Sequence, residues 1–238
     1  MTIGKLDTVV LDVADLAAVS AFYQALVGWK EAWVDDDWIT LETADGWRIG
    51  LQSAPDHQPP VWPGQERPQQ AHLDIRVPDL EAASAQAVAL GGVLLRRNDT
   101  WHTVADPAGH PFDLCAAADN PTPTLMGVML DCPDAAVLSA FYAELLGKPV
   151  TYEAPGMAMI GEEGAHPVMF QQVEGYAAPR WPDPAYPQQF HLDVHVEDLD
   201  AGERAAVAIG ATRLAAGTDT FRVFTDPAGK PFCLTIPN

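Results

Sequence analysis

A histidine and an aspartate stand two residues apart in QQAHLDI, residues 69–75, and the same spelling returns in QQFHLDV, residues 188–194. Side chains two apart on a strand point to the same face, so each pair can act on one ligand. An imidazole beside a carboxylate can hold a divalent metal or exchange a proton with a ligand. A hydrogen-bonded duo that only lines a cleft is the alternative. The candidate catalytic residues are His72, Asp74, His191 and Asp193.

The elements around these pairs come from an internal repeat. Residues 13–28, VADLAAVSAFYQALVG, are echoed by CPDAAVLSAFYAELLG at 132–147, an offset of 119. Both histidine pairs keep that offset, and the hairpin DPAGHPFDL at 106–114 returns as DPAGKPFCL at 226–234. The sequence therefore predicts two homologous halves joined near residues 116–124.

Each half divides again into two similar modules. Residues 9–28 and 73–92 share the order of strand, aspartate, alanine-rich helix and glycine. An aspartate before each helix can cap its open backbone N–H groups, and we expect such caps at Asp15, Asp79, Asp134 and Asp198. Short runs rich in Trp, Val and Ile, broken by turn signals, then indicate antiparallel hairpins. The expected fold class is α+β, built from four βαβββ modules at residues 1–55, 70–118, 124–174 and 189–238.

The repeated patterns resemble the vicinal oxygen chelate superfamily, which includes glyoxalase I, bleomycin-resistance proteins, extradiol dioxygenases (the dihydroxybiphenyl dioxygenase type) and fosfomycin-resistance enzymes. The resemblance rests on VxDLxxxxxFYxxLxG at 13–28, its copy at 132–147, and the two DPxGxPFxL hairpins. It covers essentially the whole chain and implies two tandem glyoxalase-like domains, 1–118 and 124–238, with curved, mostly antiparallel sheets that enclose clefts. It implies a fold more than a reaction, because the superfamily hosts unrelated activities.

The resemblance also places metal ligands on the first and last strand of each module. The first-strand position lies seven residues before each capping aspartate, which gives Thr8, His72, Gly127 and His191. The last-strand position, normally glutamate, falls on Gln52, Asp113, Gln171 and Cys233. The two modules of one half can pair, or the halves can exchange modules. Neither pairing assembles a complete family ligand set.

The favoured expectation is therefore that no cofactor is bound. The alternative is a divalent metal (iron, manganese, zinc or nickel) held by His72 and Asp113, with Gln52 and water completing its shell. His191 and Cys233 alone are too few for a stable zinc site.

Aromatic and polar residues complete the candidate site. Trp62 and Trp181 lie in long proline-rich connectors, where they can close over a flat ligand or simply anchor the connector. Further aromatic residues lie on predicted strands and should divide between core and cleft; they are Trp38, Trp47, Trp101 and Phe221. The candidate ligand-binding residues are Thr8, Gln52, Trp62, Trp101, Gln171 and Trp181.

The amino-acid composition limits the classes of molecule that the protein can bind. The net charge of -20 argues against nucleic acid and anionic membranes, because both need clustered basic residues. Three widely spaced cysteines, among them Cys115 and Cys132, favour reduced, inert thiols, and no signal segment precedes the fold, so we expect a cytoplasmic protein. A small-molecule ligand is the expected partner, with the chain a monomer containing an internal pseudodimer, or a homodimer.

The favoured function is that of a glyoxalase or bleomycin-resistance-like protein that binds a small apolar or aromatic molecule without a complete metal site. Two enzymatic alternatives stay open. One is a metal-dependent lyase, isomerase or dioxygenase, and the other is metal-free acid/base chemistry by the cleft histidines.

Overall fold

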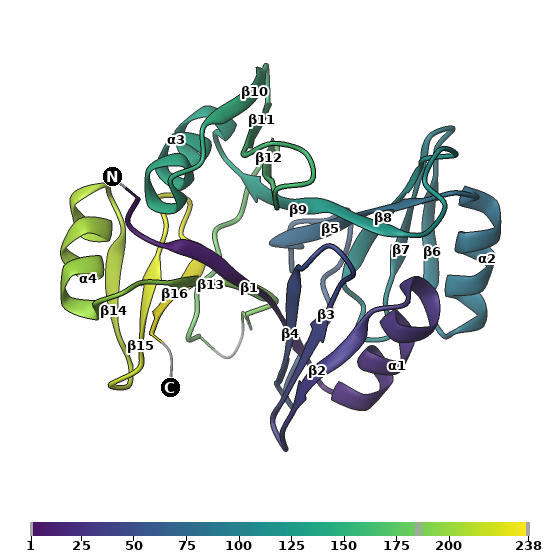
Figure 1. Cartoon of the computed structure of the whole chain (residues 1–238), viewed down its shortest axis with the longest axis horizontal. Coiled ribbons are helices and arrows are strands. Elements are labelled where there is room, and N and C mark those ends of the chain that lie inside the picture. Colours follow the sequence, from purple (N-terminus) through teal and green to yellow (C-terminus); the bar gives the residue numbers. More distant parts are fainter. Residues whose placement is uncertain (1, 184–185, 187, 237–238) are drawn as a thin grey trace.

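The computed structural model describes residues 2–183, 186 and 188–236, and each of its four modules is a strand, a helix and three further strands (Figure 1). The first module is β1 (Lys5–Val13), α1 (Leu16–Val27), β2 (Lys30–Val34), β3 (Trp38–Glu42) and β4 (Arg48–Ser53). The second is β5 (Ala71–Val77), α2 (Leu80–Ala89), β6 (Val93–Arg97), β7 (Trp101–Ala105) and β8 (Pro111–Ala116). The third is β9 (Thr124–Cys132), α3 (Ala135–Leu146), β10 (Val150–Ala154), β11 (Met157–Ile160) and β12 (Val168–Gln172). The fourth is β13 (Phe190–His195), α4 (Leu199–Ala208), β14 (Thr212–Gly217), β15 (Phe221–Thr225) and β16 (Pro231–Thr235).

All four predicted helix caps are confirmed. The carboxylate of Asp15 accepts a 3.0 Å hydrogen bond from the backbone N–H of Ala18, and Asp79, Asp134 and Asp198 do the same for their helices. Gly28 ends α1 at a φ of 75°, a conformation that favours glycine. Among the described residues, no helix is long and apolar enough to span a bilayer.

The strands form two eight-stranded sheets, and each sheet takes one module from each half of the chain. One has the order β14-β15-β16-β13-β1-β4-β3-β2, and the other has the order β10-β11-β12-β9-β5-β8-β7-β6. The antiparallel pairs β1·β13 and β5·β9 join the halves. Within a module only the first and last strands are parallel, so the sheets are mostly antiparallel, as expected. The halves therefore exchange modules.

The helices, by contrast, pack mainly within their own half, with a smaller contact of α3 on β1. Figure 1 shows α1 and α2 together at one end of the molecule and α3 and α4 at the other, with the sheets running between them. Phe22 on α1 meets Phe112 on β8 with ring centroids 5.9 Å apart, and Phe141 on α3 meets Phe232 on β16 at the same distance. The hydrophobic core thus ties the modules of one half together, while the sheets tie the two halves to each other.

Candidate functional site

Each sheet encloses a cleft on its polar face. The first, named here the β13 cleft, has a volume of about 600 Å³ and contains His191, Asp193 and Cys233. The second, the β5 cleft, has a volume of about 400 Å³ and contains His72, Asp74 and Asp113. The candidate ligand-binding residues divide evenly, with Thr8, Gln52 and Trp181 in the β13 cleft and Trp62, Trp101 and Gln171 in the β5 cleft.

One expected grouping is wrong. Gln52 was expected beside His72 and Asp113, but it lines the β13 cleft, because β4 belongs to the sheet that contains β13. Gln171 of β12 takes the corresponding place in the β5 cleft. The aromatic residues on the strands divide between the core and the clefts, as expected. Trp47 is buried in the core, whereas Trp38, Trp101 and Phe221 line clefts.

In the β5 cleft, His72 lies among carboxylates. Its Nε2 is 3.3 Å from Asp74 Oδ1 and 3.9 Å from Asp113 Oδ2. Asp74 is 5% exposed, and no donor is aligned on its Oδ1, so the pair is an ion contact rather than a well-directed hydrogen bond. Burial by itself lowers the pKa of His72, but Asp74 and then Asp113 outweigh it and raise that pKa to about 9.

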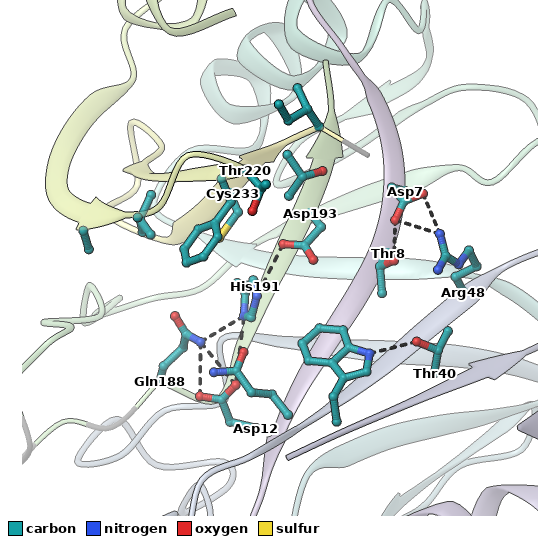
Figure 2. A pocket seen from close by; sticks show the side chains of 18 of the residues that line it. Asp7, Thr8, Asp12, Thr40, Arg48, Gln188, His191, Asp193, Thr220 and Cys233 are labelled. Carbon is teal, nitrogen blue, oxygen red and sulfur yellow. Dashed lines mark hydrogen bonds and ion pairs between the residues drawn. The ribbon is translucent and has the colours of Figure 1, made fainter. Parts of the chain in front are cut away.

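The β13 cleft repeats this arrangement with a thiol in place of one carboxylate. His191 Nε2 is 3.5 Å from Asp193 Oδ1, and Cys233 lies on the neighbouring strand β16, paired with Asp193 in register (Figure 2). Burial lowers the pKa of His191, but Asp193 and then Cys233 outweigh it and raise that pKa to about 10. Burial also raises the pKa of the Cys233 thiol, which favours its protonated form.

A glutamine holds the other side of each imidazole. Gln188 Nε2 lies 3.2 and 3.1 Å from the two carboxylate oxygens of Asp12 and 2.9 Å from His191 Nδ1 (Figure 2). An amide nitrogen has two hydrogens and accepts none, so it donates one to Asp12 and the other to the imidazole. Turning the amide over would press its oxygen against the carboxylate. Nδ1 of His191 is therefore an acceptor, and the ring hydrogen sits on Nε2.

The β5 cleft has the same arrangement, in which one glutamine amide lies between a carboxylate and Nδ1 of the histidine; we call this arrangement the amide clamp. Gln69 Nε2 is 3.1 Å from His72 Nδ1 and 3.4 Å from Asp131 Oδ1, and Asp131 also accepts a 2.7 Å hydrogen bond from Gln171. Here the carboxylates and the amide act in opposite directions. Asp74 and Asp113 favour a second proton on His72, yet that proton would have to sit on Nδ1, against an amide N–H. When the ring carries a single hydrogen, the amide places that hydrogen on Nε2.

Sequence reasoning did not select the clamp residues. They are Asp12, Gln69, Asp131 and Gln188. The signal was present, because Gln69 and Gln188 open the repeated segments, and Asp12 and Asp131 obey the same offset of 119. Their role depends on module exchange, which brings Asp12 on β1 beside His191 on β13.

The residues present do not fit the family's metal ligand set. Three donor atoms do approach within 4.8 Å of one another in each cleft, from His72, Asp74 and Asp113 and from His191, Asp193 and Cys233. However, the partner strand supplies Thr8 in one cleft and Gly127 in the other where the family has its second histidine. A Cβ on Gly127 would lie 2.9 Å from the backbone oxygen of Pro167, so no side chain fits there. A metal-bound imidazole also normally donates from its second nitrogen, whereas Nδ1 accepts here.

The walls of the two clefts have diverged. The β5 cleft contains Arg96, whose guanidinium stacks 4.5 Å above the ring of Trp62, together with Thr103 and the apolar pair Met129 and Met157. The β13 cleft instead has Ala216 and Val223 on β14 and β15, and Trp38 and Arg48 on the opposite wall. Arg48 is ion-paired with Asp7 at 2.9 Å. The clefts thus share their histidine clamp but offer different surfaces to a ligand.

The other two cysteines behave as the sequence predicts. Burial raises the pKa of Cys115 to about 12 and that of Cys132 to about 11. Both thiols are therefore protonated at neutral pH and are poor nucleophiles.

The family model described as "Glyoxalase-like domain" matches residues 8–115 and again residues 127–235. A protein named "Putative glyoxylase CFP32" in Mycobacterium bovis is 26% identical, covering 98% of this chain and 95% of its own length, and its namesake in Mycobacterium tuberculosis matches equally well. The crystal structure of glyoxalase I from Zea mays superimposes with a TM-score of 0.71 at 21% identity, covering 98% of this chain and 92% of that one. At that identity the structural likeness demonstrates a shared fold.

Proposed function

The chain belongs to the glyoxalase-like domain family, with two copies of the domain, and on that premise we propose that it binds a small, largely apolar or aromatic molecule in its clefts without the family's metal set. The clefts have volumes of about 600 and 400 Å³, within the range of small-molecule sites. Each combines aromatic side chains with a few convergent polar groups, which is the usual composition of such sites.

The observation that carries this proposal is the amide clamp on each histidine. Gln188 donates to Nδ1 of His191 and Gln69 donates to Nδ1 of His72. The hydrogen then lies on Nε2, so that nitrogen has no free lone pair for a metal ion. The clamp favours a histidine that orients hydrogen bonds over one that coordinates a cation.

The polar groups of the clefts favour a ligand with hydrogen-bond donors. Asp74 Oδ1 is buried without an aligned donor, and Asp113 lies beside it. A buried acceptor without a partner costs free energy, so a ligand hydroxyl or amino group that donates to it would bind more tightly. The aromatic or apolar body of the ligand can lie against Trp62 and Trp101 on one side and Met129 on the other.

Proflavine, a flat aromatic cation with two amino groups, is a suitable probe. We expect it to bind to the purified protein with micromolar affinity, monitored by the fluorescence of the dye, and to bind equally well after dialysis against EDTA. Asp74→Asn should weaken binding in the β5 cleft, and Asp193→Asn should do so in the β13 cleft. Asp99→Asn, in an exposed turn far from both carboxylates in sequence, is the charge-matched control.

Two results would overturn the proposal. One is loss of binding on EDTA treatment with recovery on adding a divalent metal, which would show that the ligand is held through a cation. The other is unchanged proflavine binding when both cleft aspartates are replaced together, which would place the dye elsewhere on the acidic surface.

A further inference from the structure

A row of polar side chains crosses the β5 cleft. Arg96 on β6 pairs in register with Thr103 on β7, and Thr103 pairs with Asp113 on β8. Asp113 in turn pairs with Asp74 on β5. All four residues line the same cleft. The row therefore places a guanidinium, a hydroxyl and two carboxylates on successive strands that lie about 4.8 Å apart.

A β-bulge turns Arg96 into the cleft. The register of β6 against β7 shifts between Leu94 and Arg96, so Leu95 is the extra residue. Leu94, opposite Val104, packs against the hydrophobic core, whereas Arg96, two residues later, lines the cleft. In a regular strand, residues two apart share a face. The bulge breaks that alternation and directs Arg96 to the polar face of the sheet.

The guanidinium of Arg96 is oriented by stacking. Its Cζ lies 4.5 Å from the centroid of the Trp62 ring, and within the described ranges it has no hydrogen bond or ion pair with another residue. The adjacent Arg97, by contrast, is ion-paired with Glu81. Stacking uses the face of the guanidinium plane and leaves the N–H groups at its edge able to donate. That planar edge matches the geometry of a carboxylate.

The β13 cleft lacks this row. Three members of the row have less polar residues at the corresponding places of β14, β15 and β16; they are Arg96, Thr103 and Asp113, replaced by Ala216, Val223 and Cys233. Arg48 also lines the β13 cleft, but it is ion-paired with Asp7 at 2.9 Å. The two clefts thus differ in whether they offer a ligand an arginine that no carboxylate already holds.

We propose that the clefts take different classes of ligand, and that the β5 cleft binds an aromatic amino or hydroxy acid whose carboxylate lies on Arg96. Its amino or hydroxyl group donates to Asp74 or Asp113, and its ring lies against Trp101, which is 40% exposed. The β13 cleft takes an uncharged, more apolar molecule. This inference rests on the proposed binding function and adds to it the specificity of each cleft.

The reason for the specificity is the pairing of charges. A ligand with hydrogen-bond donors alone satisfies the carboxylates of the row and leaves Arg96 without a partner. A ligand that also carries an acid group gains charge-assisted hydrogen bonds to the guanidinium, which are roughly twice as strong as neutral ones. In the β13 cleft the same acid group would meet Ala216 and Val223 and would lose its hydration without compensation.

Isothermal titration calorimetry with two matched ligands tests the inference. 4-Aminobenzoate carries a donor and an acid group, and its methyl ester carries the donor without the charge. We expect 4-aminobenzoate to bind at one site per chain. Arg96→Met should weaken that binding about tenfold or more, the usual effect of losing a hydrogen bond to a charged group, and should leave the affinity for the ester unchanged. Arg96→Lys, which keeps the charge without the planar fork, should recover part of the loss.

Arg97→Met is the matched control, because it removes the same charge from the next residue and should change the affinity for neither ligand. The inference is overturned if 4-aminobenzoate does not bind, or if Arg96→Met leaves its affinity unchanged. It is also overturned if both arginine variants weaken 4-aminobenzoate equally, or if Arg96→Met weakens the ester as much as the acid, since the residue would then act through overall charge or through the fold.

Proflavine separates a failure of this inference from a failure of the proposed function. If the dye binds as expected while 4-aminobenzoate does not depend on Arg96, the specificity is wrong and the proposed function stands. If neither the dye nor either benzoate ligand binds, both are wrong.

Discussion

Thr8 on β1 and Asp193 on β13 face each other across an antiparallel ladder, although they come from opposite halves of the chain. The register shifts between Leu6 and Thr8, at the edge of the β13 cleft. This pairing, with its counterpart Asp74 and Gly127 in the other sheet, is what closes each cleft. Neither half can complete a sheet without strands from the other half.

Separated halves should therefore fail to fold as monomers. We expect fragments 1–122 and 123–238, expressed alone, to aggregate or self-associate, because each would expose the unpaired strands β1 and β5 or β9 and β13. Mixing them should restore a one-to-one complex with the circular dichroism of the intact chain. Analytical ultracentrifugation checks both statements. A half that sediments as a monomer and unfolds cooperatively would contradict them.

Gly127→Ala should destabilise the protein. The new Cβ would lie 2.9 Å from the backbone oxygen of Pro167 and 3.0 Å from the end of Met169, and only the second of these can move easily. Overpacking of this kind costs about 1–3 kcal/mol in the free energy of unfolding. Urea denaturation followed by tryptophan fluorescence measures the difference. Equal stability of the variant and the native protein would contradict this prediction, because it would show that β9 shifts enough to accommodate the methyl group.

Gln188→Glu should convert His191 into a better metal ligand. A carboxylate in place of the amide can share a proton with Asp12, whose pKa burial already raises, and accept a hydrogen from Nδ1, which leaves a lone pair on Nε2 beside Asp193 and Cys233. We expect zinc affinity, measured by competition with a chromogenic chelator, to rise about tenfold or more. Gln172→Glu, an exposed site, controls for the added charge. If both variants bind zinc equally, the clamp does not govern coordination.

His57 should make the protein less stable in mild acid. Burial and then the neighbouring His110 lower its pKa from 6.5 to about 4, so between these values the unfolded chain holds a proton that the folded chain lacks. The contribution to stability is complete above pH 6.5 and is lost as the pH falls towards 4. His57→Phe should show a shallower fall in the free energy of unfolding between pH 7 and 5. Parallel curves for the two proteins would rule out this role.

Local chemistry was enough to predict the modules. Each capping aspartate, such as Asp15, satisfies the helix that directly follows it, and each glycine such as Gly28 ends a helix through its own backbone freedom. The strand alternation that places His72 and Asp74 on one face is also local. The sequence alone therefore determined the α+β fold, the four repeats and the position of both histidine pairs in clefts.

The tertiary structure decided which modules meet. Homologous modules present nearly the same first strand, so β1 could pair with β5 or with β13 at little difference in local pattern, and only long-range packing distinguishes them. That choice placed Gln52 in the other cleft from His72, brought Asp12 to His191 and set Lys230 against the backbone oxygen of Gln70. The sequence shows the histidines and the glutamines three residues before them, but the carboxylates that orient those glutamines, Asp12 and Asp131, come from the other half of the chain. Only the tertiary structure brings them together, because that pairing depends on which modules share a sheet.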